Sequence, residues 1–210
     1  FRSLSGRPLL YWPLRSFEKS PSVKQVVLVV SAARLPWARR FLRECRFWKV
    51  TAVVAGGRER MDSVLRGFAA VPSSTDVVLF HDAARALVSP GVIERVARSA
   101  RRTGAALAAW PVPDTVKLGR APRRGKVLVA RTVPRRNLWL AQTPQGFTRA
   151  VAEKIFRRSR RNITDDVQWA ERAGRSVEIV PGSPENLKVT LPEDFKLCEA
   201  LLAARKRVSR

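Results

Sequence analysis

Cysteine and histidine are scarce in this sequence, which contains two cysteines, Cys45 and Cys198, and a single histidine, His81. The cysteines lie far apart, with neither a C-x-x-C pair nor a cluster of cysteine with histidine, which excludes a disulfide framework and a zinc site of the usual spacing. We therefore expect a reducing compartment, and we assign no metal ligands among the side chains.

Long apolar runs are also missing. No stretch approaches the length of about 18 residues that a candidate membrane span needs. The first residues carry Arg2 and Arg7 without a following apolar segment and cleavage site, so we expect no secretory signal among them. We expect a soluble cytoplasmic protein that has no membrane partner.

Acidic residues are few, since 17 Asp and Glu face 41 Lys and Arg, for a net charge of +24. Such an excess invites a nucleic-acid interpretation, because phosphates attract Lys and Arg. The basic residues are nevertheless scattered, with local clusters at 157–161 and 205–210. We find no helix-turn-helix pattern, zinc ligands or RNP-like aromatic strand. We interpret the excess as a solvated surface and predict no nucleic-acid partner.

Short β-branched runs alternate with amphipathic stretches along the chain, and 210 residues that are 45% hydrophobic suit one domain. Strands are predicted at 25–33, 49–57, 76–80, 105–110 and 176–180. Helices are predicted at 35–45, 59–71, 91–102, 149–159, 165–173 and 192–205, with a less regular stretch at 111–143. Apolar strands joined by helices indicate an α/β fold whose mostly parallel sheet carries helices on both faces.

Polar motifs gather at the predicted strand ends and loops. They are GGRERMDS (56–63), HDAAR (81–85), PDTVK (113–117), TVPRRNLWLAQTPQGF (132–147), ITDD (163–166) and NLKVT (186–190). Each has a local explanation; Thr164 and the acids after it, for example, are typical of a helix N-terminus. Ligands of such sheets bind beyond the carboxyl ends of the strands, so the set together predicts a binding site there.

In this order and spacing, the motifs resemble the 2-C-methyl-D-erythritol 4-phosphate cytidylyltransferases, over about residues 4–202. The resemblance implies a Rossmann-like nucleotidyltransferase fold and transfer of CMP from CTP to methylerythritol phosphate in non-mevalonate isoprenoid biosynthesis. It also implies Mg²⁺, bound mainly through the CTP phosphates, and a homodimer. An arm over about 112–136 would complete the partner's site.

The resemblance also assigns roles to single residues. Those expected to bind the nucleotide are Gly57, Arg58, Arg60, Ser63, Asp82 and Ala83. Those expected to bind the acceptor substrate are Asp82, Arg85, Thr115, Arg135, Thr143, Thr164 and Lys188. Arg135 and Lys188 are the expected catalytic pair that positions the acceptor phosphate. Transfers of this kind depend on positioning and on cations, so His81 is interpreted as a packed or hydrogen-bonded residue without a proton-transfer role.

The sequence departs from the family pattern in two places. Ala86 stands where proline usually follows the arginine of HDAAR. The resemblance further implies an opening strand, a glycine-rich loop and a P-K-Q segment ahead of FRSLSGRPLLYWPLRSF (1–17). We therefore expect an upstream truncation and a chain that is a poor catalyst or inactive as it stands. Two alternatives stay open: a ribitol-phosphate or other sugar-alcohol-phosphate cytidylyltransferase, and a non-catalytic nucleotide-binding paralogue.

Overall fold

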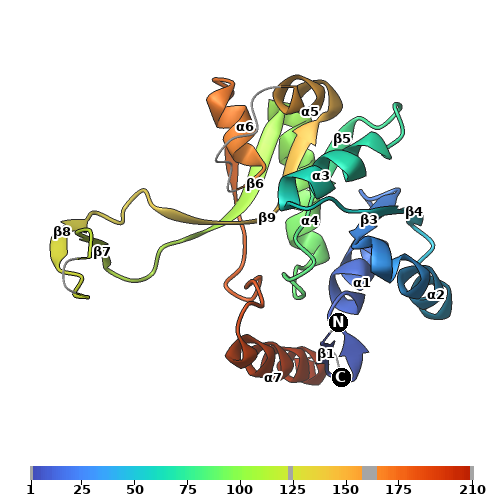
Figure 1. The fold of residues 1–210 in the computed structure, drawn as a ribbon, viewed down its shortest axis with the longest axis horizontal. Helices are drawn as coiled ribbons and strands as arrows, with labels where there is room; N and C mark the ends of the chain where they lie inside the picture. Colours follow the sequence, from blue (N-terminus) through green and yellow to red (C-terminus); the bar gives the residue numbers. More distant parts are fainter. Residues whose placement is uncertain (1, 123–124, 158–164, 209–210) are drawn as a thin grey trace.

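The computed structural model describes residues 2–122, 125–157 and 165–208 (Figure 1). The strands are β1 (Ser3–Leu4), β2 (Arg7–Pro8), β3 (Val26–Val30), β4 (Val50–Ala55), β5 (Val77–Phe80), β6 (Ala105–Pro111), β7 (Val116–Gly119), β8 (Val129–Val133), β9 (Trp139–Thr148) and β10 (Glu178–Pro181). The helices are α1 (Tyr11–Lys19), the 3-10 helix η1 (Ala32–Arg34), α2 (Leu35–Cys45), α3 (Arg60–Ala69), α4 (Pro90–Thr103), α5 (Arg149–Phe156), α6 (Val167–Arg172) and α7 (Pro192–Val208).

The central sheet has the strand order β10-β6-β9-β5. Strands β10 and β6 are parallel, whereas β9 runs antiparallel to both β6 and β5. Strands β5, β6 and β10 therefore share one direction and β9 alone is reversed. Strands β3 and β4 form a separate parallel pair. The predicted α/β class is confirmed, including the mostly parallel strand direction.

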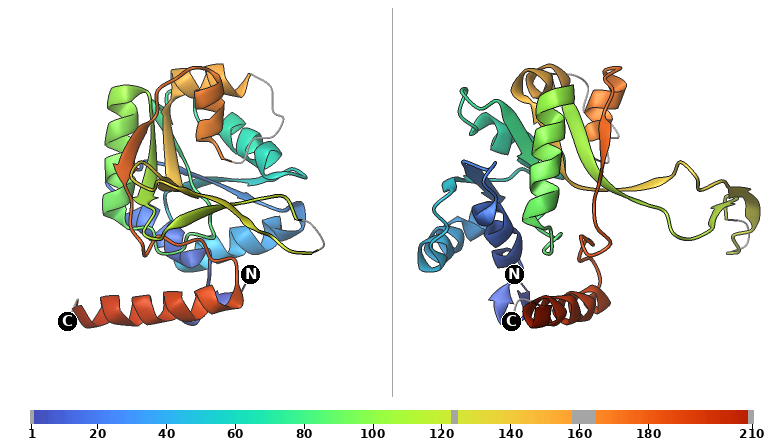
Figure 2. Two further views of the ribbon diagram at one scale, coloured as in Figure 1. Left: turned by 90° about the vertical axis from the view of Figure 1, so that its left-hand side faces the viewer. Right: turned by 180° about the vertical axis from the view of Figure 1, so that it is seen from behind.

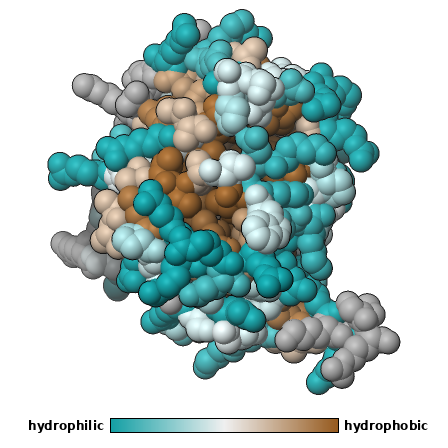
Figure 3. All heavy atoms as spheres, turned by 90° about the vertical axis from the view of Figure 1, so that its right-hand side faces the viewer, coloured by the Kyte–Doolittle hydropathy of each residue, from teal (hydrophilic) through white to brown (hydrophobic). Residues whose placement is uncertain are grey.

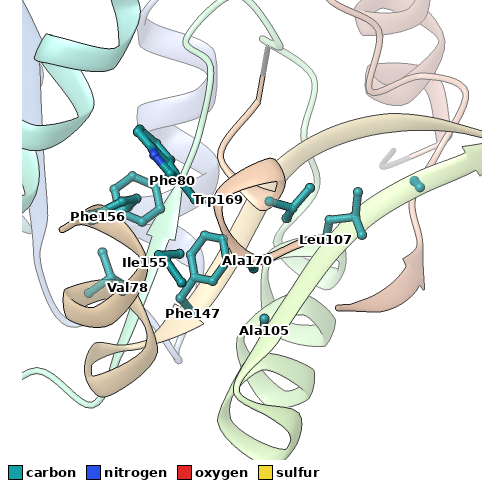
Figure 4. Packing of buried hydrophobic residues seen from close by; sticks show 12 residues of the cluster. Val78, Phe80, Ala105, Leu107, Phe147, Ile155, Phe156, Trp169 and Ala170 are labelled. Carbon is teal, nitrogen blue, oxygen red and sulfur yellow. The ribbon is translucent and has the colours of Figure 1, made fainter. Parts of the chain in front are cut away.

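Both faces of the central sheet are covered, as the continuous apolar runs of β5 and β6 predict. On one face, Val78, Phe80 and Phe147 pack with apolar residues of α5 and α6 (Figure 4). Apolar residues of α3 pack against the same cluster. On the other face, Val77 and Ala106 pack with α1 and α4. Because successive side chains of β5 and β6 point to opposite faces, they divide the core into two layers that hold the strand ends in place.

One prediction about this sheet is wrong. Residues 111–143 were expected to be less regular and AQTPQGF to lie in a loop, but strand β9 runs from Trp139 to Thr148 between β5 and β6. Its polar residues Gln142, Thr143 and Gln145 are buried and hydrogen-bonded, so a central strand has a polar sequence. We predicted a loop because the composition of this segment is polar.

The segment between β6 and β9 forms an arm that projects from the body (Figures 1 and 2). Strands β7 and β8 pair as an antiparallel hairpin within it. The hairpin exposes large apolar side chains, with Val127, Leu128 and Val129 each more than 60% exposed. An apolar surface so far from the core is typical of an interaction site.

A groove separates the β3-β4 pair from the central sheet. Its walls include residues 25–31 of β3 and its flanks and residues 76–83 of β5 and its flanks, and its volume is about 1160 Å³. Figure 3 shows hydrophobic residues gathered in a hollow on the face that carries these strands. Within the described part of the chain, β3 pairs only with β4 and β5 only with β9, so each has one unpaired edge.

Helix α7 lies across the base of the molecule beside the N-terminal strand β1 (Figure 2). Its buried residues Cys198 and Leu202 join Leu4, Leu87 and Val189 in a small separate cluster. Among the residues that the structure describes, no helix is both long and apolar enough to cross a membrane.

Candidate active site

The loop after β4 is folded tightly against the start of α3. A Cβ atom added to Gly57 would lie 2.1 Å from Cβ of Asp62, so only glycine fits this position. The backbone N–H of Gly57 donates to Oγ of Ser63 at 3.1 Å, and that hydroxyl donates to the carbonyl of Glu59 at 3.3 Å. Ser63 thus fixes the loop, while Arg58 is exposed on its outer side.

Arg60 leaves the first turn of α3 and joins two carboxylates. Its Nη1 and Nη2 each donate to Asp166 at 2.8 Å, and its Nη2 lies 3.1 Å from Oδ1 of Asp82. The Asp166 side chain is fully buried. Hydrogen bonding to Asp166 raises the pKa of Arg60 despite the opposing effect of burial. Burial raises the pKa of Asp166, and the guanidinium of Arg60 offsets part of that rise.

Asp82 lies at the end of β5, where the apolar strand stops. Its second carboxylate oxygen is 3.0 Å from Nζ of Lys188, so the carboxylate sits between two cations. Burial alone would raise the pKa of Asp82, but Arg60 and Lys188 outweigh it and the pKa is lowered. The neighbouring Ala83 is exposed, which leaves backbone at this turn open to a ligand.

Arg85 connects three segments of backbone. Its guanidinium donates to the carbonyl oxygens of Asn186 at 2.8 Å and Ala141 at 3.0 Å. The N–H of Val189 in turn donates to the carbonyl of Ala84 at 2.9 Å. Burial lowers the pKa of Arg85. These contacts shape the turn around Asp82 and attach it to the NLKVT segment.

Two glutamines of β9 hold the neighbouring loops. Oε1 of Gln142 accepts from Nδ2 of Asn186 at 3.2 Å. Gln145 accepts from the N–H of Val167 at 3.0 Å and donates to Asp165 at 3.2 Å. The AQTPQ motif thus fastens the segments that carry Asp166 and Lys188 to the central sheet.

A third polar residue of this strand, Thr143, faces the end of β5. Its Oγ1 accepts from the N–H of Asp82 at 3.1 Å and lies 3.0 Å from Nδ1 of His81. The His81 ring is half-buried and packs against the ring of Phe17, with 5.1 Å between centroids. The expectation that His81 is packed and hydrogen-bonded is confirmed.

The body of the chain therefore brings together part of the expected site. Arg60, Asp82, Arg85, Thr143 and Lys188 lie within one connected set of contacts. Thr115 and Arg135 instead flank the arm hairpin. Both are exposed, and Arg135 donates to the carbonyl of Pro113 within the arm.

Two residues of the ITDD motif, Thr164 and Asp166, differ from the rest of the expected site. Thr164 lies outside the described residues, so its expected role stays a prediction. Asp166 was not singled out from the sequence, although it is the buried partner of Arg60. The signal was available in the two adjacent acids of ITDD, which we interpreted as helix-capping residues.

Comparison with known proteins places this geometry in a family. The family described as 2-C-methyl-D-erythritol 4-phosphate cytidylyltransferase matches residues 1–204. A relative of that name from Pelotomaculum thermopropionicum is 44% identical over 210 residues, covering 98% of this chain and 87% of the relative.

Solved structures agree with this assignment. The 2-C-methyl-D-erythritol 4-phosphate cytidylyltransferase of Thermus thermophilus has a TM-score of 0.78 at 35% identity, covering 95% of this chain and 90% of that chain. The 4-diphosphocytidyl-2C-methyl-D-erythritol synthase of Anaerococcus prevotii has a TM-score of 0.84 at 25% identity, covering 96% and 88%. The expected Rossmann-like nucleotidyltransferase fold is confirmed. The chain belongs to the 2-C-methyl-D-erythritol 4-phosphate cytidylyltransferase family.

Proposed function

We propose that this chain transfers CMP from CTP to 2-C-methyl-D-erythritol 4-phosphate, releasing pyrophosphate, in the synthesis of isoprenoid precursors. The observation that carries the proposal is the cluster of Arg60, Asp82 and Lys188 in a chain whose family match spans residues 1–204. The cluster offers one oriented carboxylate and one exposed cation on the same side of the sheet.

In the proposed reaction, an oxygen of the acceptor phosphate attacks the α-phosphorus of CTP. A P–O bond forms to the acceptor while the P–O bond to pyrophosphate breaks, and pyrophosphate leaves with that electron pair. Such transfers depend on positioning and on cations that absorb negative charge. Lys188 is 45% exposed, so its ammonium can move from Asp82 to the incoming phosphate while Arg60 still holds the carboxylate.

The other expected residues take their proposed roles around this pair. Gly57, Arg58 and Ser63 read the cytosine with support from Arg60, and Asp82 and Ala83 contact the ribose. Arg85, Thr143 and Thr164 support or contact the acceptor from the body, and Thr115 and Arg135 reach it from the partner subunit's arm.

Mg²⁺ would be held mainly by the CTP phosphates, and it would supply positive charge that offsets the negative charge of the pyrophosphate leaving group. Both oxygens of the Asp82 carboxylate are engaged in ion pairs. Within residues 2–122, 125–157 and 165–208, no three His, Cys, Asp or Glu side chains are grouped to hold a metal ion. This donor set fits a cation carried by ligand phosphates better than one enclosed by protein side chains.

We also propose a cytoplasmic location. Cys45 and Cys198 are both free thiols. Burial raises the pKa of Cys198 to about 11, which keeps that thiol protonated and unreactive at neutral pH. A pair of unlinked cysteines suits a reducing compartment.

The proposed activity is tested by pyrophosphate release. With methylerythritol phosphate and Mg²⁺, we expect CTP to be used in preference to ATP and GTP, because the tight loop at 56–63 admits a small pyrimidine close to backbone groups. We expect CTP to be preferred over UTP because the matching family is one of cytidylyltransferases. Turnover is measured with each nucleotide at equal concentration. Equal use of UTP would contradict the cytosine assignment, and a preference for ribitol phosphate would transfer the proposal to a different acceptor.

The arm is proposed to form a homodimer and to complete the site of the second copy. Replacing Leu128, which is 63% exposed at the hairpin, with aspartate should shift the protein toward monomer, because burying a charge in an apolar interface is unfavourable. Analytical ultracentrifugation measures the change. Leu197→Asp alters a residue that is 52% exposed on α7 and serves as the control, which should leave the dimer intact. A fully active wild-type monomer at micromolar concentration would overturn the proposal.

A further inference from the structure

The proposed reaction leaves the single histidine, His81, without a role. Its Nε2 lies 3.2 Å from the carbonyl oxygen of Arg85, and its Nδ1 lies 3.0 Å from Oγ1 of Thr143. A carbonyl oxygen can only accept a hydrogen bond, so Nε2 carries the hydrogen of the neutral ring and Nδ1 is the acceptor. Thr143 therefore donates its hydroxyl hydrogen to His81.

This contact sets the direction of the Thr143 hydroxyl. With its hydrogen turned toward His81, Oγ1 presents a lone pair to the backbone N–H of Asp82, which donates to it at 3.1 Å. Asp82 is thereby held by its main chain on one side. On the other side its carboxylate meets Arg60 at 3.1 Å and Lys188 at 3.0 Å.

The surroundings of the ring keep it neutral. Burial lowers the pKa of His81 to about 4, and the positive charge of Arg85 acts in the same direction. The hydrogen bond to the Arg85 carbonyl, the charge of Asp82 and the contact with Thr143 oppose that shift without cancelling it. A protonated ring would place a hydrogen on Nδ1 and force the Thr143 hydroxyl to turn away.

We propose that His81 is a positioning residue, whose neutral imidazole acts through Thr143 to hold the backbone of Asp82 and so to place its carboxylate between Arg60 and Lys188. The expected effect on turnover rests on the proposed cytidylyl transfer. The hydrogen-bond relay itself is present without substrate, so it can be tested separately.

The kinetic test compares His81→Leu, His81→Asn, Thr143→Val and the double variant His81→Leu/Thr143→Val. Leucine at position 81 removes the hydrogen-bond acceptor of the buried Thr143 hydroxyl. We therefore expect His81→Leu to lower kcat/KM for CTP by about tenfold to a hundredfold, mainly through KM. Asparagine offers an oxygen near the position of Nδ1, so His81→Asn should recover most of that loss. The double variant should be no more impaired than the more impaired of the two single variants, because both substitutions break the same relay.

The structural test uses the fact that the chain has one histidine, which makes its ring signals unambiguous. Nitrogen-15 NMR of the full chain should show hydrogen on Nε2 and a bare Nδ1 at neutral pH, and Thr143→Val should shift the Nδ1 signal. Thermal melting of each variant shows whether the fold is kept.

The proposal would be overturned by hydrogen on Nδ1, by additive losses in the double variant, or by an asparagine variant as impaired as the leucine variant. Loss of stability with unchanged KM would likewise assign His81 to packing alone. A wild-type chain that neither transfers the cytidylyl group nor binds CTP would contradict the proposed function, whereas the NMR result would still decide whether the relay exists.

Discussion

Replacing Lys188 with alanine is expected to lower kcat/KM for methylerythritol phosphate by two or more orders of magnitude. A charge-assisted phosphate contact in a partly desolvated site contributes roughly 2 to 4 kcal/mol, and each 1.4 kcal/mol corresponds to about tenfold in rate. The affinity for CTP should barely change, because Arg60 still holds Asp82. Steady-state kinetics with each substrate varied in turn measures both effects. Lys196→Ala, an exposed lysine on α7, is the matched control and should behave as wild type.

Arg135→Ala is expected to lower kcat/KM for methylerythritol phosphate by a similar factor, for the same reason. Together, the two variants test whether the site is shared between subunits. If the arm crosses over, a mixed dimer of Lys188→Ala and Arg135→Ala subunits contains one site in which both residues are intact. Mixing the two inactive proteins should then restore measurable turnover. A mixture that stays as inactive as its parents would place both residues in one subunit's site, and a collapse of CTP binding in both variants would show that we divided the loops wrongly.

The second large effect is expected at Asp166. Alanine at this position removes the fully buried carboxylate that receives two hydrogen bonds from Arg60. Breaking a buried ion pair by removing one partner costs roughly 3 to 5 kcal/mol. We expect the lower end, about 3 kcal/mol, because the Arg60 side chain is 40% exposed and keeps Asp82 as a partner. Urea denaturation followed by tryptophan fluorescence measures the free energy of unfolding.

A matched control separates this effect from a simple loss of charge. Glu44→Ala removes the acid of the Arg40–Glu44 pair, whose side chains are 67% and 65% exposed. Exposed pairs contribute less than about 1 kcal/mol, so this variant should be close to wild type. Activity should also fall in Asp166→Ala, since the guanidinium of Arg60 is then oriented by Asp82 alone. An Asp166→Ala protein as stable and active as Glu44→Ala would show that the buried pair holds neither the fold nor the site.

Local sequence patterns predicted many of the helices and strands of the fold. Helix α2 coincides with the predicted range 35–45, because apolar residues recur at helical spacing there. Strand β5 was predicted one residue longer than it is. Strand β9 was missed because the residues that make it recognisable as a motif are polar, and their burial depends on partners from distant loops.

In the candidate site, too, single residues could be predicted from the sequence but their contacts could not. Asp82 and Lys188 were identified from motifs, yet their contact joins residues far apart in the sequence and could not be inferred from spacing. Asp166 was missed because a buried acid and a helix-capping acid look alike in a sequence. The partner of an ionised side chain is decided by tertiary packing, which no local pattern records.

The groove between β3 and β5 bears on how the folded chain behaves in concentrated solution. Unpaired strand edges and apolar walls favour edge-to-edge association with other copies. The net charge of +24 opposes that association, because like-charged molecules repel one another over the Debye length. Added salt shortens this length from about 30 Å at 0.01 M to about 8 Å at 0.15 M. Colloidal stability of the free protein is therefore greatest in dilute buffer, and multivalent anions that neutralise the surface promote its precipitation.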